Sequence, residues 1–225
     1  MRCYGFLSGR RFWHEGCEKE DGMKTILSLA VLSAVAAAKA GIVNGDFSSG
    51  SSGFTSDYST GSLYDPAVIG VDTNPSNVHG SWSPFGDHTS GNGNMLIVNG
   101  GSTEADASKD FWKSSDTMSA GSYVLSFYAA SSYPESPANI QLMVNGSAVG
   151  STGTLSSPPG EWTKYSFGFN AVDGVNSFGL RDLDTHFSGN DFAIDDISVQ
   201  AVPEPASMAA LGLGALGMLK RRKKA

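Results

Sequence analysis

A loop rich in Gly, Pro and Ser, from residue 78 to residue 94, holds the side chains best suited to binding chemistry. Two aromatic residues, Trp82 and Phe85, lie close together in it, and its polar residues include His79, Asp87, His88 and Asn92. Proteins bind sugars by packing the C–H face of the ring on an aromatic side chain while polar groups bond to the hydroxyls. The loop therefore predicts a sugar site at Trp82, Phe85, Asp87 and His88. The alternative is that Trp82 is a buried anchor of the loop.

Residues for catalysis are few. After residue 40 the chain has three histidines, His79, His88 and His186, and no cysteine. It lacks the Gly-x-Ser-x-Gly motif of a nucleophile elbow and the His-Glu-x-x-His motif of a zinc protease. We expect no catalytic residues and no enzyme activity.

The segment from residue 182 to residue 191 holds three aspartates, Asp182, Asp184 and Asp191. It lacks the Asp-x-Asp-x-Asp-Gly spacing and the terminal Glu of an EF-hand loop. We interpret it as an ordinary acidic loop.

The elements that must position these loops are predicted to be strands, because short aromatic and β-branched runs alternate with Gly, Ser and Asn turns. In the run 139–150, the dipeptide Asn145-Gly146 predicts a type I′ hairpin turn. Alternation places Tyr123, Leu125 and Phe127 on one face of their strand. The expected strands cover residues 41–47, 95–100, 122–130, 139–150, 162–170, 175–182 and 191–200. A weaker candidate at 63–70 is limited to an edge or bulge by Pro66.

This pattern predicts an all-β fold, a single antiparallel β-sandwich of the jelly-roll type over residues 41–201. A signal peptide and a short C-terminal hydrophobic helix are expected to flank it. Cys3 and Cys17 both precede the sandwich, so the core must be stable without a disulfide.

Residues 23–40 have the three parts of a signal peptide. Lys24 is the basic start, an apolar run follows, and Ala38-Lys39-Ala40 forms an A-x-A cleavage site before Gly41. Residues 1–22 are interpreted as an upstream artefact of the chosen start codon, the alternative being a genuine extension.

The region left after removal of both ends, residues 41–205, is strongly acidic. Its four basic and 18 acidic residues give a net charge of −14. A field of this sign repels nucleic acid, so we exclude nucleic acid as a partner.

The last 24 residues have three parts in a fixed order. Pro203-Glu204-Pro205 comes first, then 14 uncharged residues from 206 to 219, then a basic cluster that includes Arg221 and Arg222. The apolar run reaches about 21 Å as a helix, short of a ~30 Å hydrocarbon core. This order resembles the PEP-CTERM sorting signal over residues 202–225. The resemblance implies recognition and cleavage by an exosortase, delivery to the cell surface or extracellular matrix, and membrane contact through the tail alone.

The strand segments NGDFSSG, AGSYVLSFYA, EWTKYSFGF and FAIDDISV resemble, in this order, those of galactose-binding-like jelly-roll domains, which include carbohydrate-binding modules. The resemblance implies a structural Ca²⁺ between the first and last strands, held by Asp46 and Asp195. Ser48 stands where that family often has Glu. Alternation is expected to place Asp195 and Asp196 on opposite faces. The alternative is that these carboxylates cap turns or face solvent.

Together these observations predict an exported, non-enzymatic surface or matrix protein associated with exopolysaccharide or biofilm. The alternative is a dedicated carbohydrate-binding module that recognises one polysaccharide through loop aromatics. An exposed aromatic patch would favour the module, and a uniformly polar, acidic surface would favour the matrix component.

Overall fold

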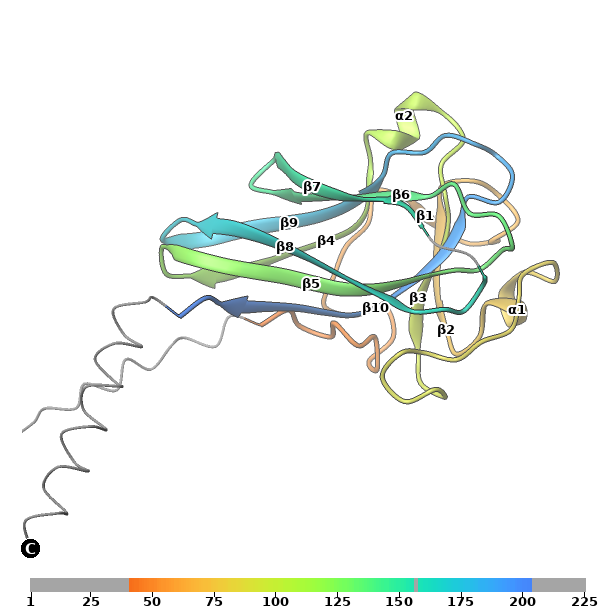
Figure 1. Cartoon of the computed structure of the whole chain (residues 1–225). Coiled ribbons are helices and arrows are strands. Elements are labelled where there is room, and N and C mark those ends of the chain that lie inside the picture. Colours follow the sequence, from red (N-terminus) through yellow and green to blue (C-terminus); the bar gives the residue numbers. More distant parts are fainter. Residues whose placement is uncertain (1–40, 156–157, 204–225) are drawn as a thin grey trace, which may run out of the picture. The chain divides into compact units, whose positions relative to one another are not determined.

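The computed structural model describes residues 41–155 and 158–203, which contain two β-sheets (Figure 1). The expected signal peptide and the sorting-signal residues Glu204, Pro205, Arg221 and Arg222 lie outside the described residues, as do residues 1–22. The strands are β1 (Ser59–Thr60), β2 (Val68–Asp72), β3 (Met95–Asn99), β4 (Asp110–Met118), β5 (Gly121–Ser131), β6 (Asn139–Val144), β7 (Ser147–Thr154), β8 (Thr163–Ala171), β9 (Gly174–Asp182) and β10 (Asp191–Ala201). Two short helices are α1 (Pro75–Val78) and α2 (Glu104–Ala107).

The two sheets form the predicted sandwich. One has the strand order β1-β2-β3-β10-β5-β8 and the other β4-β9-β6-β7. Within both sheets the neighbours run antiparallel, except for the two-residue parallel pair β1–β2. The predicted all-β antiparallel sandwich is therefore confirmed.

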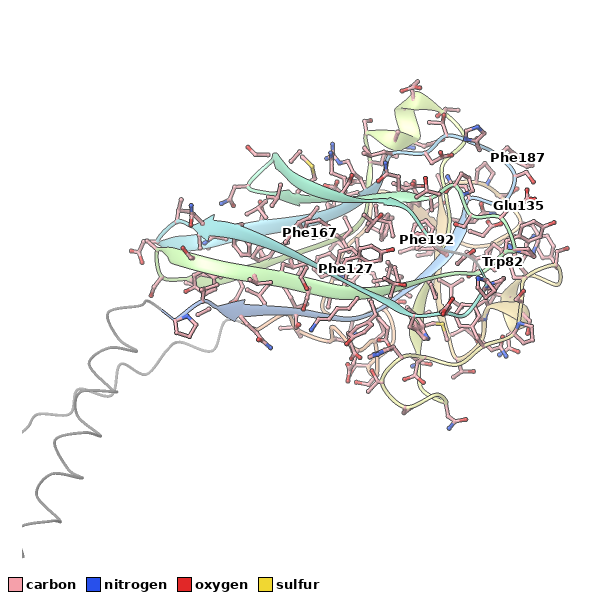
Figure 2. The ribbon with its side chains drawn as sticks, viewed as in Figure 1. Trp82, Phe127, Glu135, Phe167, Phe187 and Phe192 are labelled. Atoms are coloured by element: carbon pink, nitrogen blue, oxygen red, sulfur yellow. The ribbon has the colours of Figure 1, made fainter. Side chains whose placement is uncertain are left out.

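The core lies between the sheets and follows the alternation of side chains along each strand. Leu125 and Phe127 of β5 are fully buried, as are Phe192 and Ile194 of β10. From the facing sheet, Leu180 of β9 belongs to the same cluster. Phe127 and Phe192 are among the buried rings visible between the sheets (Figure 2). Hydrophobic burial on this scale is the main source of stability in a domain without disulfides.

The hairpin prediction is also confirmed. Asn145 and Gly146 join β6 to β7, and their φ angles are 50° and 76°. Both central residues of a type I′ turn need positive φ, which Asn and Gly adopt at low cost.

The structure differs from the predicted strands at residues 41–47 and at β4. Residues 41–47 form turns rather than a strand, and Asn44 and Phe47 have positive φ. This segment is nevertheless held against β10, where the N–H of Ile197 donates to the carbonyl of Gly45 at 2.9 Å. Strand β4 was not among the predicted strands, and Trp112 within it is 1% exposed.

Candidate functional site

Trp82 is buried, so the structure corrects the expectation of an exposed platform and supports the loop-anchor alternative. Its side chain is 4% exposed, and the ring of His79 stacks on it with centroids 4.5 Å apart. Tyr64 covers the other end of this stack, 4.1 Å from His79, and is itself 61% exposed. Burial raises the pKa of Asp191 to about 6, and a hydrogen bond with the Trp82 side chain opposes that rise. Trp82 lies among the loops at one end of the sandwich (Figure 2).

Asp87 shapes the second half of the loop by accepting hydrogen bonds from it. The N–H of Gly93 donates at 2.7 Å and the N–H of Ser90 at 3.0 Å. Burial alone would raise the pKa of Asp87, but these bonds outweigh it and hold the pKa below its usual value. The backbone folds back so closely that a Cβ at Gly86 would lie 2.0 Å from the carbonyl oxygen of Gly91. Asp87 therefore has a structural role in this loop.

His88 and Thr89 attach the loop to the large sheet. Both residues donate backbone N–H groups to Asp195, at 2.9 and 3.1 Å. The ring of His88 contacts Asp196 at 2.6 Å through Nδ1 and stacks on Tyr128. Burial raises the pKa of Asp195 to about 6, although these donors partly oppose the rise.

The predicted placement of Asp195 and Asp196 on opposite faces is wrong. The pairing of β10 with β5 shifts register between Asp195 and Ser198, and Asp196 has a φ of 51°. This bulge directs both carboxylates to the same two loop residues, His88 and Thr89.

Two adjoining hollows lie beside the loop, and we call them together the asparagine cleft. Each has a volume of about 340 Å³, and both are lined by Thr73 and Asn92. The cleft's other lining residues are Asp46, Ser48, Asn74, Asn77, Pro84, Phe85, Gly86, Asp87, Thr89, Ser90, Gly91, Gly93 and Asn94. It therefore combines one aromatic ring with four amide side chains, several hydroxyls and two carboxylates.

The aromatic residue of the cleft is fixed by its neighbours. Phe85 is half-buried and meets Trp162 edge to face, with centroids 5.8 Å apart. Trp162 in turn donates its indole N–H to the carbonyl of Gly86 at 3.1 Å. Trp162 is half-buried beneath the loop and packs against a hydrophobic cluster that includes Trp82.

Several amides of the cleft are available to a ligand. Asn77 donates through Nδ2 to Asp72 at 2.7 Å, which orients its amide. The side chains of Asn92 and Asn94 make no hydrogen bond with any other described residue. An amide offers both donors and an acceptor, which suits it to hydroxyl groups.

The structure brings together some of the predicted site residues and separates others. Phe85 and Asp87, predicted for sugar, line the cleft together with Asp46, predicted for calcium. Trp82, His88 and Asp195 do not line it. Our sequence reasoning missed Asn74, Asn77 and Asn94; the Asn-Gly-Asn and Asn-Pro-Ser-Asn runs were the available signal.

The predicted calcium ligands have protein partners of their own. Asp46 accepts from the N–H and hydroxyl of Ser48, and Asp195 accepts from His88 and Thr89. Within residues 41–155 and 158–203, no group of three or more His, Cys, Asp or Glu side chains is placed to hold a metal ion. The calcium site at Asp46 and Asp195 stays a prediction.

A larger hollow, about 450 Å³, lies on the outer face of the large sheet. Tyr128, Lys164 and Asp196 line it, and the Lys164 ammonium lies 5.7 Å from the centre of the Tyr128 ring. This hollow holds the one basic side chain of the described region that is outside an ion pair.

Comparison with protein families gives one match, the PEP-CTERM protein-sorting motif, at residues 201–224. The predicted sorting signal is therefore confirmed. The motif marks a secreted protein that is sorted to the cell surface or extracellular space, and it implies processing by an exosortase. Among the described residues, no helix is both long and apolar enough to cross a membrane.

Comparison with solved structures gives carbohydrate-binding modules with jelly-roll folds. The CBM22-1 xylan-binding domain of Paenibacillus barcinonensis Xyn10C is 16% identical, with 75% of this chain and 99% of that chain covered and a TM-score of 0.44. TmCBM61, solved with β-1,4-galactotriose, is 15% identical, with 71% and 96% covered and a TM-score of 0.44. The sugar-binding EclA C-terminal domain is 19% identical, with 40% and 66% covered and a TM-score of 0.37.

These are similarities of backbone only, and the fold class rests on the two sheets described above. A search of curated proteins finds no match.

Proposed function

We propose that this exported protein binds a polysaccharide of the cell surface or extracellular matrix, and that the asparagine cleft is its binding site. One observation carries the proposal: a half-buried aromatic ring, Phe85, shares a cleft with four asparagine side chains, two of which make no hydrogen bond with any other described residue. The proposed activity is binding and not catalysis.

The role of each side chain in the cleft follows from the chemistry of sugars. The Phe85 ring would pack against the C–H face of one sugar residue, because aromatic faces attract polarised C–H groups. The amides of Asn77, Asn92 and Asn94 would exchange hydrogen bonds with hydroxyls of that residue and its neighbours. Asp87 and Asp195, which accept hydrogen bonds from the loop, would keep it in the conformation that presents these groups.

The test uses the full chain in affinity electrophoresis, in which a gel containing a polysaccharide retards a protein that binds it. We expect Asn92→Ala to weaken retention about 2- to 10-fold, the loss expected for one hydrogen bond. Phe85→Ala should weaken it at least as much.

Phe187→Ala is the matched control, since Phe187 is 72% exposed and does not line the cleft. Asn92 is exposed, so its variant should fold normally even if Phe85→Ala does not. If neither Asn92→Ala nor Phe85→Ala changes retention, the cleft is not the binding site.

A second candidate function is a structural matrix component associated with exopolysaccharide or biofilm through its acidic surface. The observation that favours it is the net charge of −14 over residues 41–205. In that case the cleft variants would not change retention. Retention would instead depend on divalent cations that bridge carboxylates of the protein and the polysaccharide.

A further inference from the structure

We infer that the polysaccharide held by the asparagine cleft carries no acidic groups. This inference rests on the proposed function and names the class of ligand for that same site. It follows from where the described region places its positive charges.

Among residues 41–155 and 158–203, no Lys or Arg lines the cleft. Its lining residues all fall between residues 46 and 94, and the sequence has no Lys or Arg from residue 41 to residue 108. The two charged side chains in the cleft, Asp46 and Asp87, are both carboxylates. With no cation bound at Asp46, an acidic sugar would meet only negative charge there.

The basic side chains of the described region are engaged elsewhere. Lys109 pairs with Asp106 at 2.9 Å, Arg181 pairs with Asp110 at 2.8 Å, and Lys113 pairs with Asp57. Lys164, the fourth, faces the hollow over Tyr128, which shares only Asp46 with the cleft. None of them lines the cleft, so none is placed there to neutralise a bound carboxylate or sulfate.

The remaining groups of the cleft suit a neutral sugar. Asparagine amides and Ser or Thr hydroxyls both donate and accept, so they can match the hydroxyls of an uncharged ring. An acidic group about 4–6 Å from one carboxylate would weaken binding roughly three- to fivefold even in a water-like dielectric. The field of the whole acidic domain adds to this discrimination.

The experiment compares polysaccharides that differ in their acidic groups, again with the full chain in affinity electrophoresis, and with a chelator present so that no divalent cation bridges carboxylates. The probes are polygalacturonate and its methyl ester, alginate and its carboxyl-reduced form, and glucuronoxylan and unsubstituted xylan. We expect one or more neutral members to retard the protein, and the acidic partner of each to retard it at least tenfold more weakly. Retention by the neutral members should change little with salt, because it involves no ion pairs. Asn92→Ala should weaken the neutral retention.

An isosteric variant tests whether the cleft itself sets the charge preference. Asp46→Asn removes one negative charge from the lining and should raise the ratio of acidic to neutral retention about threefold or more. Asp46 also lines the hollow over Tyr128, so Lys164→Ala, which changes that hollow alone, is the control and should leave the ratio unchanged.

The possible failures are separable. Stronger retention of an acidic member, lost in Asn92→Ala, would overturn the inference and leave the proposed function standing. If no neutral member is retained and acidic retention is lost in Lys164→Ala, the ligand lies on the outer face of the large sheet, and the proposed function and the inference both fail. If Asn92→Ala and Phe85→Ala leave every retention unchanged, the proposed function fails and the inference fails with it.

Discussion

At the scale of residues, the geometry of the cleft depends on a carboxylate outside it. Asp195 is fully buried, and its Oδ2 accepts the N–H groups of His88 and Thr89 and the Thr89 hydroxyl, at 2.9–3.2 Å. Its Oδ1 accepts the N–H of Asp196 at 2.8 Å. A group predicted as a calcium ligand therefore serves in this structure to attach the loop to the sheet.

Removal of that carboxylate is expected to destabilise the fold. Asp195→Ala leaves the N–H groups of His88 and Thr89 without their acceptor, and we expect a loss of about 1–3 kcal/mol of unfolding free energy. Urea denaturation followed by tryptophan fluorescence measures it, because Trp162 lies beneath the same loop. Asp173→Ala is the control, since Asp173 is exposed in the turn between β8 and β9. An Asp195→Ala variant as stable as the control would show that the loop is held by other contacts.

The predicted calcium site is tested by removal of metal. If Asp46 and Asp195 hold Ca²⁺ in the native protein, a chelator should lower the melting temperature of the full chain and added Ca²⁺ should restore it. Asp46→Asn should abolish the response. A melting temperature that chelation leaves unchanged would remove the calcium prediction.

At the scale of elements, the N-terminal segment makes an unusually close contact with the last strand. A Cβ at Gly45 would lie 2.0 Å from the backbone oxygen of Ile197. Gly45→Ala should therefore push the segment away from β10 and lower the unfolding free energy by about 1–3 kcal/mol. Gly61→Ala is the matched control, because a Cβ there meets nothing within 4 Å. Equal stability of the two variants would contradict this contact.

The sequence predicted the elements whose local pattern is strong. Asn145-Gly146 identified its hairpin, and the alternation of Leu125 and Phe127 identified a core-facing strand, because both signals depend on near neighbours alone. Strand β4 was missed because a register shift between Asp110 and Trp112 buries the adjacent Phe111 and Trp112 together. That shift breaks the alternation on which a sequence prediction depends.

The candidate site was predicted only in part. The loop 78–94 supplies most of the cleft's lining, and Phe85 and Asp87 are among the predicted residues that line it. The burial of Trp82 depends on a stack with His79 and Tyr64, and Tyr64 comes from a different segment. Likewise, the contribution of Asn74 and Asn77 depends on how α1 lies beside the loop. Contacts between distant segments of this kind leave no signature in a single sequence.

At the scale of the whole molecule, the buried aspartates set the dependence of stability on pH. Burial raises the pKa of Asp182, Asp191 and Asp195 to about 6 each, whereas an unfolded aspartate titrates near 3.9. Between these values the folded state binds more protons than the unfolded state, so the unfolding free energy falls as the pH rises. We expect the protein to be more stable near pH 4.5 than near pH 7.

The carboxylates with lowered pKa limit this gain at the acidic end. Asp57, Asp87 and Asp106 have pKa values below the usual range, so the stability they contribute is lost as the pH falls below about 4. Urea denaturation from pH 3 to pH 8 should therefore give a maximum at mildly acidic pH. Asp182→Asn should flatten the decline toward neutral pH, and stability that rises steadily from pH 5 to pH 8 would contradict these pKa shifts.

The central claim is that an exported β-sandwich binds a neutral polysaccharide in the asparagine cleft. The most direct measurement is an amide chemical-shift titration of the isotope-labelled full chain with neutral oligosaccharides of the polysaccharide that retards it. We predict saturable shifts concentrated at residues 73–77 and 85–94, the two segments that supply most of the cleft's lining, with little change around Tyr128 and Lys164. Shifts centred on Tyr128 and Lys164, or none that saturate, would contradict the account.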